Sequence, residues 1–77
     1  MYKFLIVIEK SETGYSAYSP DLPGCVATGE TEAEAEHRMY EAIELHVQGM
    51  EEDNIPIPKS TSKSVYAVFT KTKGQAA

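Results

Sequence analysis

The chain has 77 residues, which make one domain at most, and its composition, 42% hydrophobic and 25% charged, is that of an ordinary globular protein, so disorder is not expected. Its formal net charge of −5 argues against direct binding to nucleic acid, whose phosphates dominate such affinity, and favours a basic protein partner. The single cysteine excludes an intrachain disulfide, and with neither a leader nor an apolar run near ~20 residues no membrane insertion is expected, so we expect a cytoplasmic protein.

Two strands are predicted before the first proline. Tyr2 to Lys10 contains five consecutive apolar residues, Phe4 to Ile8, a pattern typical of a central strand that is covered on both faces. Ser11 to Gly14 is a polar connection of hairpin length, and the alternation from Tyr15 to Ser19 predicts a second strand. These two strands should therefore pair in antiparallel fashion.

A tight turn and a third strand follow. Pro20 ends the second strand because it has no N–H for the ladder. Asp21 to Gly24 combines an aspartate able to cap backbone N–H groups, a proline that fixes φ and a glycine free to take positive φ. Cys25 to Thr28 is predicted as a short third strand, which completes an antiparallel meander.

A long helix is predicted from about Glu32 to Glu52. Thr31 and Glu34 match a capping box, in which each side chain satisfies an orphan N–H of the first turn. Asn54 follows the helix, and asparagine is common at a left-handed C-terminal position. Apolar residues at helical spacing predict one buried stripe made of Ala35, Met39, Tyr40, Ala42, Ile43, Val47 and Met50.

The chain after the helix is predicted to be extended and then to form a fourth strand. The prolines in Ile55 to Pro58 exclude helix, and Val65 to Phe69 forms an apolar strand whose two faces both need cover. We expect one domain over residues 1–70 and a frayed tail over 71–77. Since a strand-helix-strand connection is right-handed, the fourth strand should add beside the first, giving the order third, second, first, fourth.

Several motifs in this order resemble the HicB family of bacterial and archaeal antitoxins, over roughly residues 2 to 58. These motifs are Asp21-Leu22-Pro23-Gly24-Cys25, Gly29-Glu30-Thr31, Glu34-Ala35, Glu41-Ala42-Ile43 and Ile55-Pro56-Ile57-Pro58. The chain has Arg38 where the family often has asparagine, and Asn54 where it often has glycine. Many members also carry a C-terminal DNA-binding domain, which the nineteen residues after Pro58 are too few to form.

The resemblance implies an α+β, partial ribonuclease-H-like fold of three strands, a helix and a fourth strand, with the helix on one sheet face. It implies no nuclease activity, no cofactor, and binding to a small basic toxin of the HicA type, whose RNA-cleaving surface the antitoxin covers. It also implies a homo-oligomer, a dimer or a tetramer, which would cover the second sheet face. No direct contact with nucleic acid is expected.

Catalytic groups are sparse. A ribonuclease-H-type site needs several carboxylates around two metal ions ~4 Å apart, and Glu9 and Asp21 are the only candidates outside the helix with plausible placement. His37 and His46 are nine residues apart, on opposite sides of the helix, so they cannot share a metal; His37 is expected to pair with Glu41. Cys25 has no basic neighbour in sequence to lower its thiol pKa. We therefore predict no catalytic or metal-binding residues.

The sequence favours a non-enzymatic binding module. The predicted toxin-facing residues are Tyr18, Asp21, Leu22, Pro23, Gly24, Cys25, Glu41 and Glu44. The predicted oligomer interface consists of Val65, Tyr66, Ala67, Val68 and Phe69, because a bare apolar edge strand invites aggregation unless it pairs. Two alternatives stay open, a residual metal-dependent nuclease and an orphan regulator that binds another protein or a small ligand.

Overall fold

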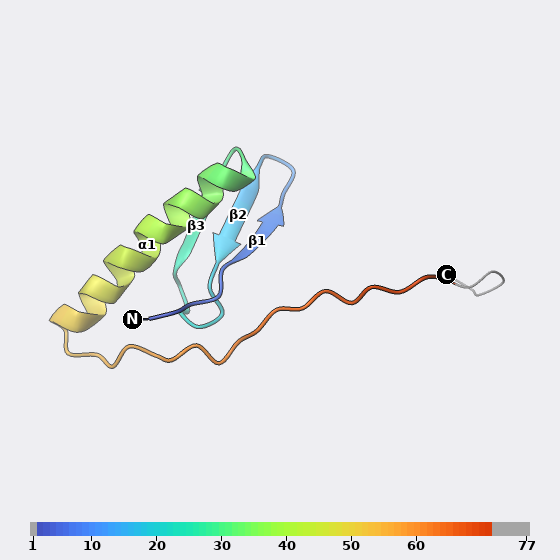
Figure 1. The fold of residues 1–77 in the computed structure, drawn as a ribbon. Coiled ribbons are helices and arrows are strands. Elements are labelled where there is room, and N and C mark those ends of the chain that lie inside the picture. Colours follow the sequence, from blue (N-terminus) through green and yellow to red (C-terminus); the bar gives the residue numbers. More distant parts are fainter. Residues whose placement is uncertain (1, 72–77) are drawn as a thin grey trace.

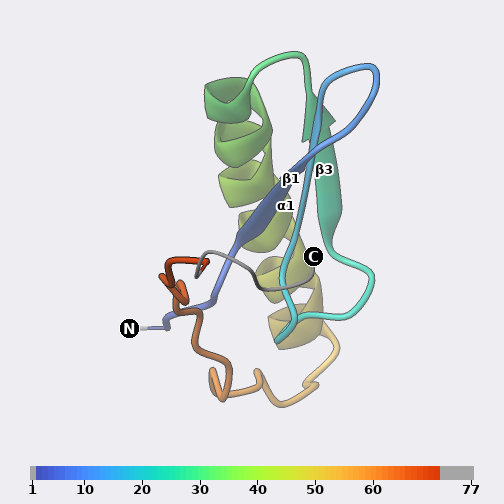
Figure 2. The ribbon, with the colours of Figure 1, turned by 90° about the vertical axis from the view of Figure 1, so that its right-hand side faces the viewer.

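The computed structural model describes residues 2–71 and forms a two-layer α+β body (Figure 1). Its elements, in chain order, are β1 (Val7–Lys10), β2 (Tyr15–Tyr18), β3 (Val26–Gly29) and α1 (Glu32–Glu52). The three strands form an antiparallel sheet in the order β1-β2-β3, and α1 packs along one face of it (Figures 1 and 2). The predicted meander and the single helix on one face are confirmed.

The strand register divides the sheet into a covered and an open face, because successive side chains point to opposite sides. The cross-strand row that packs into the core contains Ile8, Ala17 and Ala27. The neighbouring row faces away from the helix and contains Val7, Tyr18 and Val26. We call this second set the outer row.

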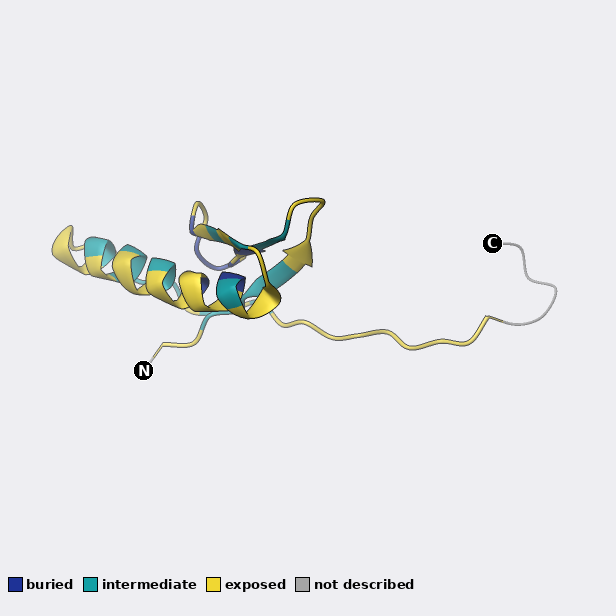
Figure 3. Ribbon diagram, turned by 90° about the horizontal axis from the view of Figure 1, so that it is seen from above, coloured by how far each residue is buried: buried dark blue, intermediate teal, exposed yellow. Residues whose placement is uncertain are grey.

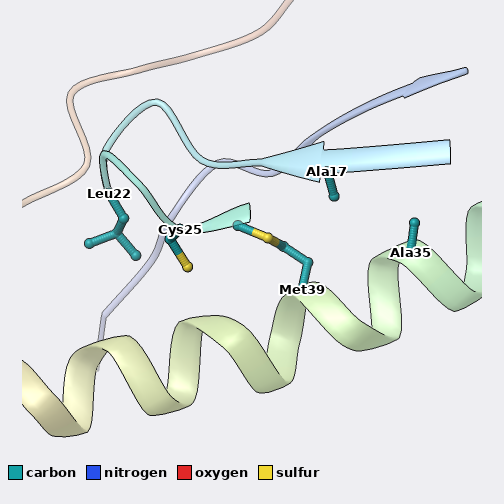
Figure 4. Close-up of a cluster of buried hydrophobic side chains, with 5 residues drawn as sticks. All are labelled: Ala17, Leu22, Cys25, Ala35 and Met39. Atoms are coloured by element: carbon teal, nitrogen blue, oxygen red, sulfur yellow. The ribbon is translucent and has the colours of Figure 1, made fainter. Parts of the chain in front are cut away.

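The core between helix and sheet is small. Its buried members are Ala17, Leu22, Cys25, Ala35 and Met39, each at most 4% exposed (Figure 4). Figure 4 shows Ala17 of β2 directly opposite Ala35 of α1, and Met39 reaching toward Cys25. Small side chains at the first of these contacts let the helix approach the sheet closely, while Met39 fills the wider space beyond it.

Two successive turns connect β2 and β3, and two residues of these turns lie in the core. The Leu22 N–H donates to the Ser19 carbonyl (3.2 Å), and the Cys25 N–H donates to the Leu22 carbonyl (3.1 Å). In the second turn Pro23 stands at the position that favours a fixed φ, and Gly24 has φ +84°, as a type II turn requires. This geometry confirms the predicted turn and explains why Leu22 and Cys25 both point inward.

The start of α1 follows the predicted capping box with one difference. The Thr31 hydroxyl accepts from the Glu34 N–H (3.1 Å), whereas the Glu34 carboxylate accepts from the N–H of Glu30, one residue before the cap (3.0 Å). Gly29 precedes this cap, and a Cβ there would lie 2.5 Å from the Ala35 nitrogen. Only glycine therefore lets β3 run directly into the helix.

The end of α1 is a Schellman motif. The Asn54 N–H donates to the Glu51 carbonyl (3.2 Å), and the Ile55 N–H donates to the Met50 carbonyl (2.8 Å). Asn54 has φ +56°, which confirms the left-handed position predicted from the sequence. The motif reverses the chain and sends residues 55–61 back toward the sheet.

Most of the predicted helical stripe packs toward the sheet (Figure 3). Ala35 and Met39 are buried, and Ala42, Ile43, Val47 and Met50 are half-buried. Tyr40 is an exception at 56% exposure, and its hydroxyl donates to the Glu36 carboxylate (3.0 Å). In the part of the chain that the structure describes, no helix has the length and apolar character needed to cross a bilayer.

Asp21 joins three distant segments through its carboxylate. Its Oδ2 accepts from the Leu5 N–H (3.3 Å) and from the Ser60 hydroxyl (2.9 Å), and its Oδ1 accepts from the Thr61 N–H (3.2 Å). The residue is 9% exposed. The sequence predicted an aspartate that caps backbone N–H groups, and the structure shows that these groups come from remote parts of the chain.

The predicted fourth strand is wrong for this single chain. Residues 65–69 are extended but unpaired, and their large apolar side chains are almost fully exposed: Val65 79%, Tyr66 99%, Val68 93% and Phe69 85%. β1 is consequently an edge strand and not the predicted central one. The physical reason is that a strand apolar on both faces needs cover on both, and one helix lying mainly over β3 supplies too little.

Without the fourth strand, the sheet has three strands where four were predicted, and the chain is less compact than expected. The Cα radius of gyration is 16.4 Å, against about 11 Å for a compact domain of this length. Because the fourth strand does not form, the ribonuclease-H-like fold and the domain bounds of 1–70 stay predictions. Of the predicted frayed tail, only Lys71 belongs to the described residues.

The Asp21 contacts predict a pH-dependent stability. Burial raises the pKa of the Asp21 carboxyl, but hydrogen bonds from Ser60, Leu5 and Thr61 outweigh it and hold the pKa below its ordinary value. The stabilisation is therefore complete above the unfolded-state pKa of about 3.9 and is lost as the pH falls through the lower folded-state pKa. Asp21→Asn should lower the melting temperature at pH 7, and the difference from the unmodified protein should shrink toward pH 3.

Thermal unfolding followed by circular dichroism at pH 7, 5, 4 and 3 measures this difference. Glu12→Gln, which neutralises an exposed carboxylate in the β1-β2 connection, serves as the matched control and should change little at any pH. An Asp21→Asn effect of equal size at pH 7 and pH 3 would contradict the assigned role of the carboxylate.

The Schellman motif predicts a clear order of stability at position 54. Asn54→Val places a β-branched residue at positive φ and should cost about 1–2 kcal/mol in the free energy of unfolding. Asn54→Gly should be neutral or slightly stabilising, because glycine takes this conformation freely. Urea denaturation of the three proteins measures the order, and equal stability of the valine and glycine variants would contradict it.

Candidate protein-binding surface

The predicted toxin-facing turn divides into a buried and an exposed half. Leu22 and Cys25 are 1% and 4% exposed and belong to the core, while both carboxylate oxygens of Asp21 accept hydrogen bonds from the chain itself. Pro23 and Gly24 are exposed at the tip of the turn. A partner that meets the folded body can therefore touch the tip, whereas the other three residues support it from below.

Tyr18 lies beside this tip on the open face of the sheet. It is 39% exposed and pairs across the sheet with Val7 on one side and with Val26 on the other. Val26 is 64% exposed, and Val7 is half-buried. The outer row and the turn tip lie at the same end of the sheet, because β2 ends at Tyr18, the turn follows, and β3 begins at Val26.

Sequence reasoning selected Tyr18 but missed its two neighbours. Val7 was assigned to a strand covered on both faces, and Val26 to a short strand without a stated direction. Ser16 and Tyr18 share one strand face, as do Val26 and Thr28, and the polar residues on this face are the sequence signal for an open side of the sheet. The sequence alone does not show that these residues form one surface, because only the strand register places the three residues of the outer row in line.

The predicted acidic residues of the helix lie on another side of the molecule. Glu41 and Glu44 are exposed on α1, and helical spacing places both on the side opposite to buried Met39. His37 Nε2 lies 3.7 Å from a Glu41 carboxylate oxygen, which agrees with the predicted pair. Because the helix covers one sheet face and Tyr18 points from the other, a flat partner cannot contact Tyr18 and Glu44 together.

Arg38 does not neutralise this acidic side. Its guanidinium lies 3.4 Å from Glu34 and donates to the Thr28 carbonyl (3.2 Å), so it ties the first turns of α1 to β3. The glutamates further along the helix have no lysine or arginine partner among the described residues. The helix therefore presents a net negative surface.

The geometry offers little to metal-dependent catalysis. Asp21 contacts the N–H of Leu5, and Glu9 lies four residues further along the same extended segment, roughly 13 Å away at ~3.3 Å per residue. Within residues 2–71, no group of three or more histidine, cysteine, aspartate or glutamate side chains is placed to hold a metal ion. The Asp21 oxygens are in any case occupied by backbone and hydroxyl donors.

The candidate nucleophile and bases are Cys25, His37 and His46, and each lies in the core or on the helix. Burial raises the pKa of the Cys25 thiol, which disfavours the reactive thiolate. His46 is half-buried on α1, and His37 is exposed beside Glu41. None of these side chains is arranged with a second catalytic group among the described residues.

Comparison with known proteins gives a consistent family. The sequence model described as "HicB_like antitoxin of bacterial toxin-antitoxin system" matches residues 4–74. A protein of Haemophilus phage HP1, an uncharacterized 14.9 kDa protein in the rep-hol intergenic region, is 44% identical over 61 residues. The match covers 79% of this chain but only 46% of the phage protein, so the chain spans less than half of that relative.

Two further comparisons cover more of the matched protein. A UPF0150 protein of Synechocystis is 37% identical over 60 residues, which are 77% of this chain and 76% of that protein. A chain of the solved HicA3 and HicB3 toxin-antitoxin complex superposes with a TM-score of 0.58 and 30% identity, covering 70% of this chain and 66% of that one. The family model, which spans nearly all of the sequence, and the structural likeness agree: the chain belongs to the HicB-like antitoxins of bacterial toxin-antitoxin systems.

Proposed function

We propose that this protein is a non-catalytic antitoxin that binds a small, basic, RNA-cleaving toxin of the HicA type and covers its active surface. The observation that carries the proposal is the family match over residues 4–74, supported by the likeness to a chain of a solved toxin-antitoxin complex. The role of Asp21 supports a binding function over a catalytic one, since its carboxylate holds together segments of the chain itself.

The outer row and the turn tip form the proposed toxin contact. Tyr18 is an aromatic side chain flanked by two β-branched ones, and aromatic residues in such settings often dominate the binding energy of an interface. Val26, at 64% exposure, adds apolar area that has no cover within the described chain. A toxin seated here would bury this row and meet Pro23 and Gly24 at its end.

The acidic side of α1 has a different role in this proposal. Because Glu41 and Glu44 cannot share a flat interface with Tyr18, they act at longer range on a basic partner. A negative surface raises the rate at which a positively charged protein arrives and orients, and added salt weakens this effect. The predicted toxin-facing set thus separates into contact residues and steering residues.

The open alternatives have no support of their own in the structure. A residual nuclease would need metal-binding carboxylates, and Asp21 already serves the fold. An orphan regulator would use the same surface on a different partner. The neighbouring reading frame distinguishes these cases: a small basic protein whose toxicity is relieved by co-expression supports the antitoxin, and the absence of any such gene favours the orphan regulator.

The contact surface predicts a strong effect of Tyr18→Ala on toxin binding. Loss of a central aromatic side chain costs about 2 kcal/mol or more at such interfaces, so the dissociation constant should rise at least ~30-fold. Calorimetry with the small protein encoded by the neighbouring reading frame measures the change, and a growth-rescue assay should show weaker protection.

Leu45→Ala is the matched control for this substitution. Leu45 is 68% exposed on α1, away from the sheet's open face, and its truncation removes apolar area without touching the outer row. Equal losses of affinity in the two variants would contradict the proposed surface. Circular dichroism should show that both variants keep the native helix content.

The steering residues predict a kinetic effect. Glu41→Gln combined with Glu44→Gln should slow association several-fold at low ionic strength and flatten its salt dependence, while dissociation stays nearly unchanged. Both side chains are exposed, so folding stability should hardly change. Surface plasmon resonance at several salt concentrations measures both rates, and a faster dissociation with unchanged association would assign these residues to the contact itself.

A further inference from the structure

One carboxylate connects the proposed toxin contact to the chain that returns after the helix. Asp21 belongs to the first of the two turns between β2 and β3, and the exposed tip, Pro23 and Gly24, belongs to the second. The two turns share Leu22, because its N–H donates in the first turn and its carbonyl accepts in the second. A change in the position of Asp21 is therefore passed to the tip through a continuous, hydrogen-bonded stretch of backbone.

The Asp21 carboxylate accepts hydrogen bonds from two remote segments. Its Oδ2 accepts from the Leu5 N–H (3.3 Å) and the Ser60 hydroxyl (2.9 Å), and its Oδ1 accepts from the Thr61 N–H (3.2 Å). Figure 1 shows the N-terminal segment, the turn and the returning chain meeting at the end of the sheet where β2 ends and β3 begins. The carboxylate thus holds residues that lie 39 and 40 positions further along the sequence.

The same carboxylate contacts the segment that leads into the outer row. Leu5 lies two residues before Val7, where β1 begins, and Val7 pairs with Tyr18 at the end of β2. Residues 2–6 belong to no strand of the sheet, and the Leu5 N–H donates to Asp21 in place of a neighbouring strand. Asp21 therefore joins the β1 end of the outer row to the turn that carries the tip.

Most of the hydrogen bonding at this carboxylate comes from the returning chain. Ser60 and Thr61 donate two hydrogen bonds to Asp21, against one from Leu5. Asp21 is only 9% exposed, and a carboxylate that is shielded from water is costly without donors, because it loses its hydration and gains nothing in return. If the returning chain leaves, the Asp21 side chain must turn toward solvent to recover hydrogen bonds, and the first turn moves with it.

We propose that Ser60 and Thr61 position the toxin contact through Asp21: while they occupy the carboxylate, the turn tip and the outer row keep the arrangement that fits a partner, and without them this arrangement is lost. The proposal rests on the proposed function, because it concerns the regulation of the same surface. By thermodynamic linkage, a partner that binds this surface also strengthens the hold on residues 60 and 61. Ser60 and Thr61 are positioning residues, since they act through Asp21 and not on the partner directly.

Amide hydrogen exchange in the full chain tests the positioning without a partner. Ser60→Ala combined with Thr61→Pro removes both of these donors to Asp21. Ser64→Ala combined with Thr70→Pro makes the same kinds of change at two exposed positions farther along the chain and serves as the matched control. Removal of the donors should speed exchange at least about tenfold at the two turn amides that donate hydrogen bonds, while the centre of α1 exchanges as before. The control pair should change neither region.

Two single variants keep this test decisive. Ser60→Ala alone retains the Thr61 N–H, so it should fold even where the double variant does not, and it should give the same pattern at a smaller size. Ser60→Thr keeps the hydroxyl and should keep the slow exchange of the unmodified protein. Unchanged turn amides would overturn the proposal. An equal acceleration in the turn and in the centre of α1 would also overturn it, because Ser60 and Thr61 would then only stabilise the whole fold.

Calorimetry with the small protein encoded by the neighbouring reading frame tests the consequence for binding. The Ser60→Ala, Thr61→Pro variant should raise the dissociation constant at least about tenfold, and its loss should add incompletely to that of Tyr18→Ala, because both changes disturb one surface. Thr31→Ala, which removes the N-cap of α1 at the opposite end of the sheet, lowers stability and should leave the dissociation constant within about twofold.

The outcomes separate the positioning from the antitoxin function. A dissociation constant that stays unchanged without the Ser60 and Thr61 donors, or one that Thr31→Ala raises equally, would overturn the positioning while the antitoxin function stands. Failure of the unmodified protein to bind would contradict the antitoxin function instead. The hydrogen-exchange result would then decide by itself whether Ser60 and Thr61 position the turn.

Discussion

The fold depends on one buried carboxylate more than on any other single group. Asp21 accepts hydrogen bonds from Leu5 just before β1 and from Ser60 and Thr61 after the helix. These three contacts close the body, because they bind the N-terminal segment, the β2-β3 turn and the returning chain to one point. The same contacts hold Ser60 and Thr61, so they also fix where the exposed segment of residues 65–69 leaves the body.

The two-layer architecture determines where partners can bind. A single helix covers one face of a three-stranded sheet, which leaves the outer row, the β1 edge and residues 65–69 without cover in the described chain. Burial of a large apolar side chain stabilises a complex by about 1.5–3 kcal/mol. A small domain with this much uncovered apolar surface is suited to association, and membership of an antitoxin family agrees with that property.

Local sequence features predicted the local structure correctly. Thr31 and Glu34 begin the helix, Asn54 ends it, and Pro23 with Gly24 forms the turn, because each depends on backbone preferences within four or five residues. The strand predicted for residues 65–69 does not form in the single chain, because strand formation depends on contacts with distant segments. Whether a strand forms depends on a partner edge and on cover for both faces, and neither requirement can be judged from the segment itself.

The sequence by itself determined the order of the first three strands and the helix, the helix boundaries, the turn and the family, since these follow from short-range stereochemistry and from motifs in fixed order. Only the tertiary structure decided that Leu22 and Cys25 are core residues, that Val7 and Val26 flank Tyr18, and that β1 has an open edge. The reason is that burial and strand register are properties of the whole assembled sheet. Residues that are distant in sequence become one surface only when hydrogen bonds between strands place them in line.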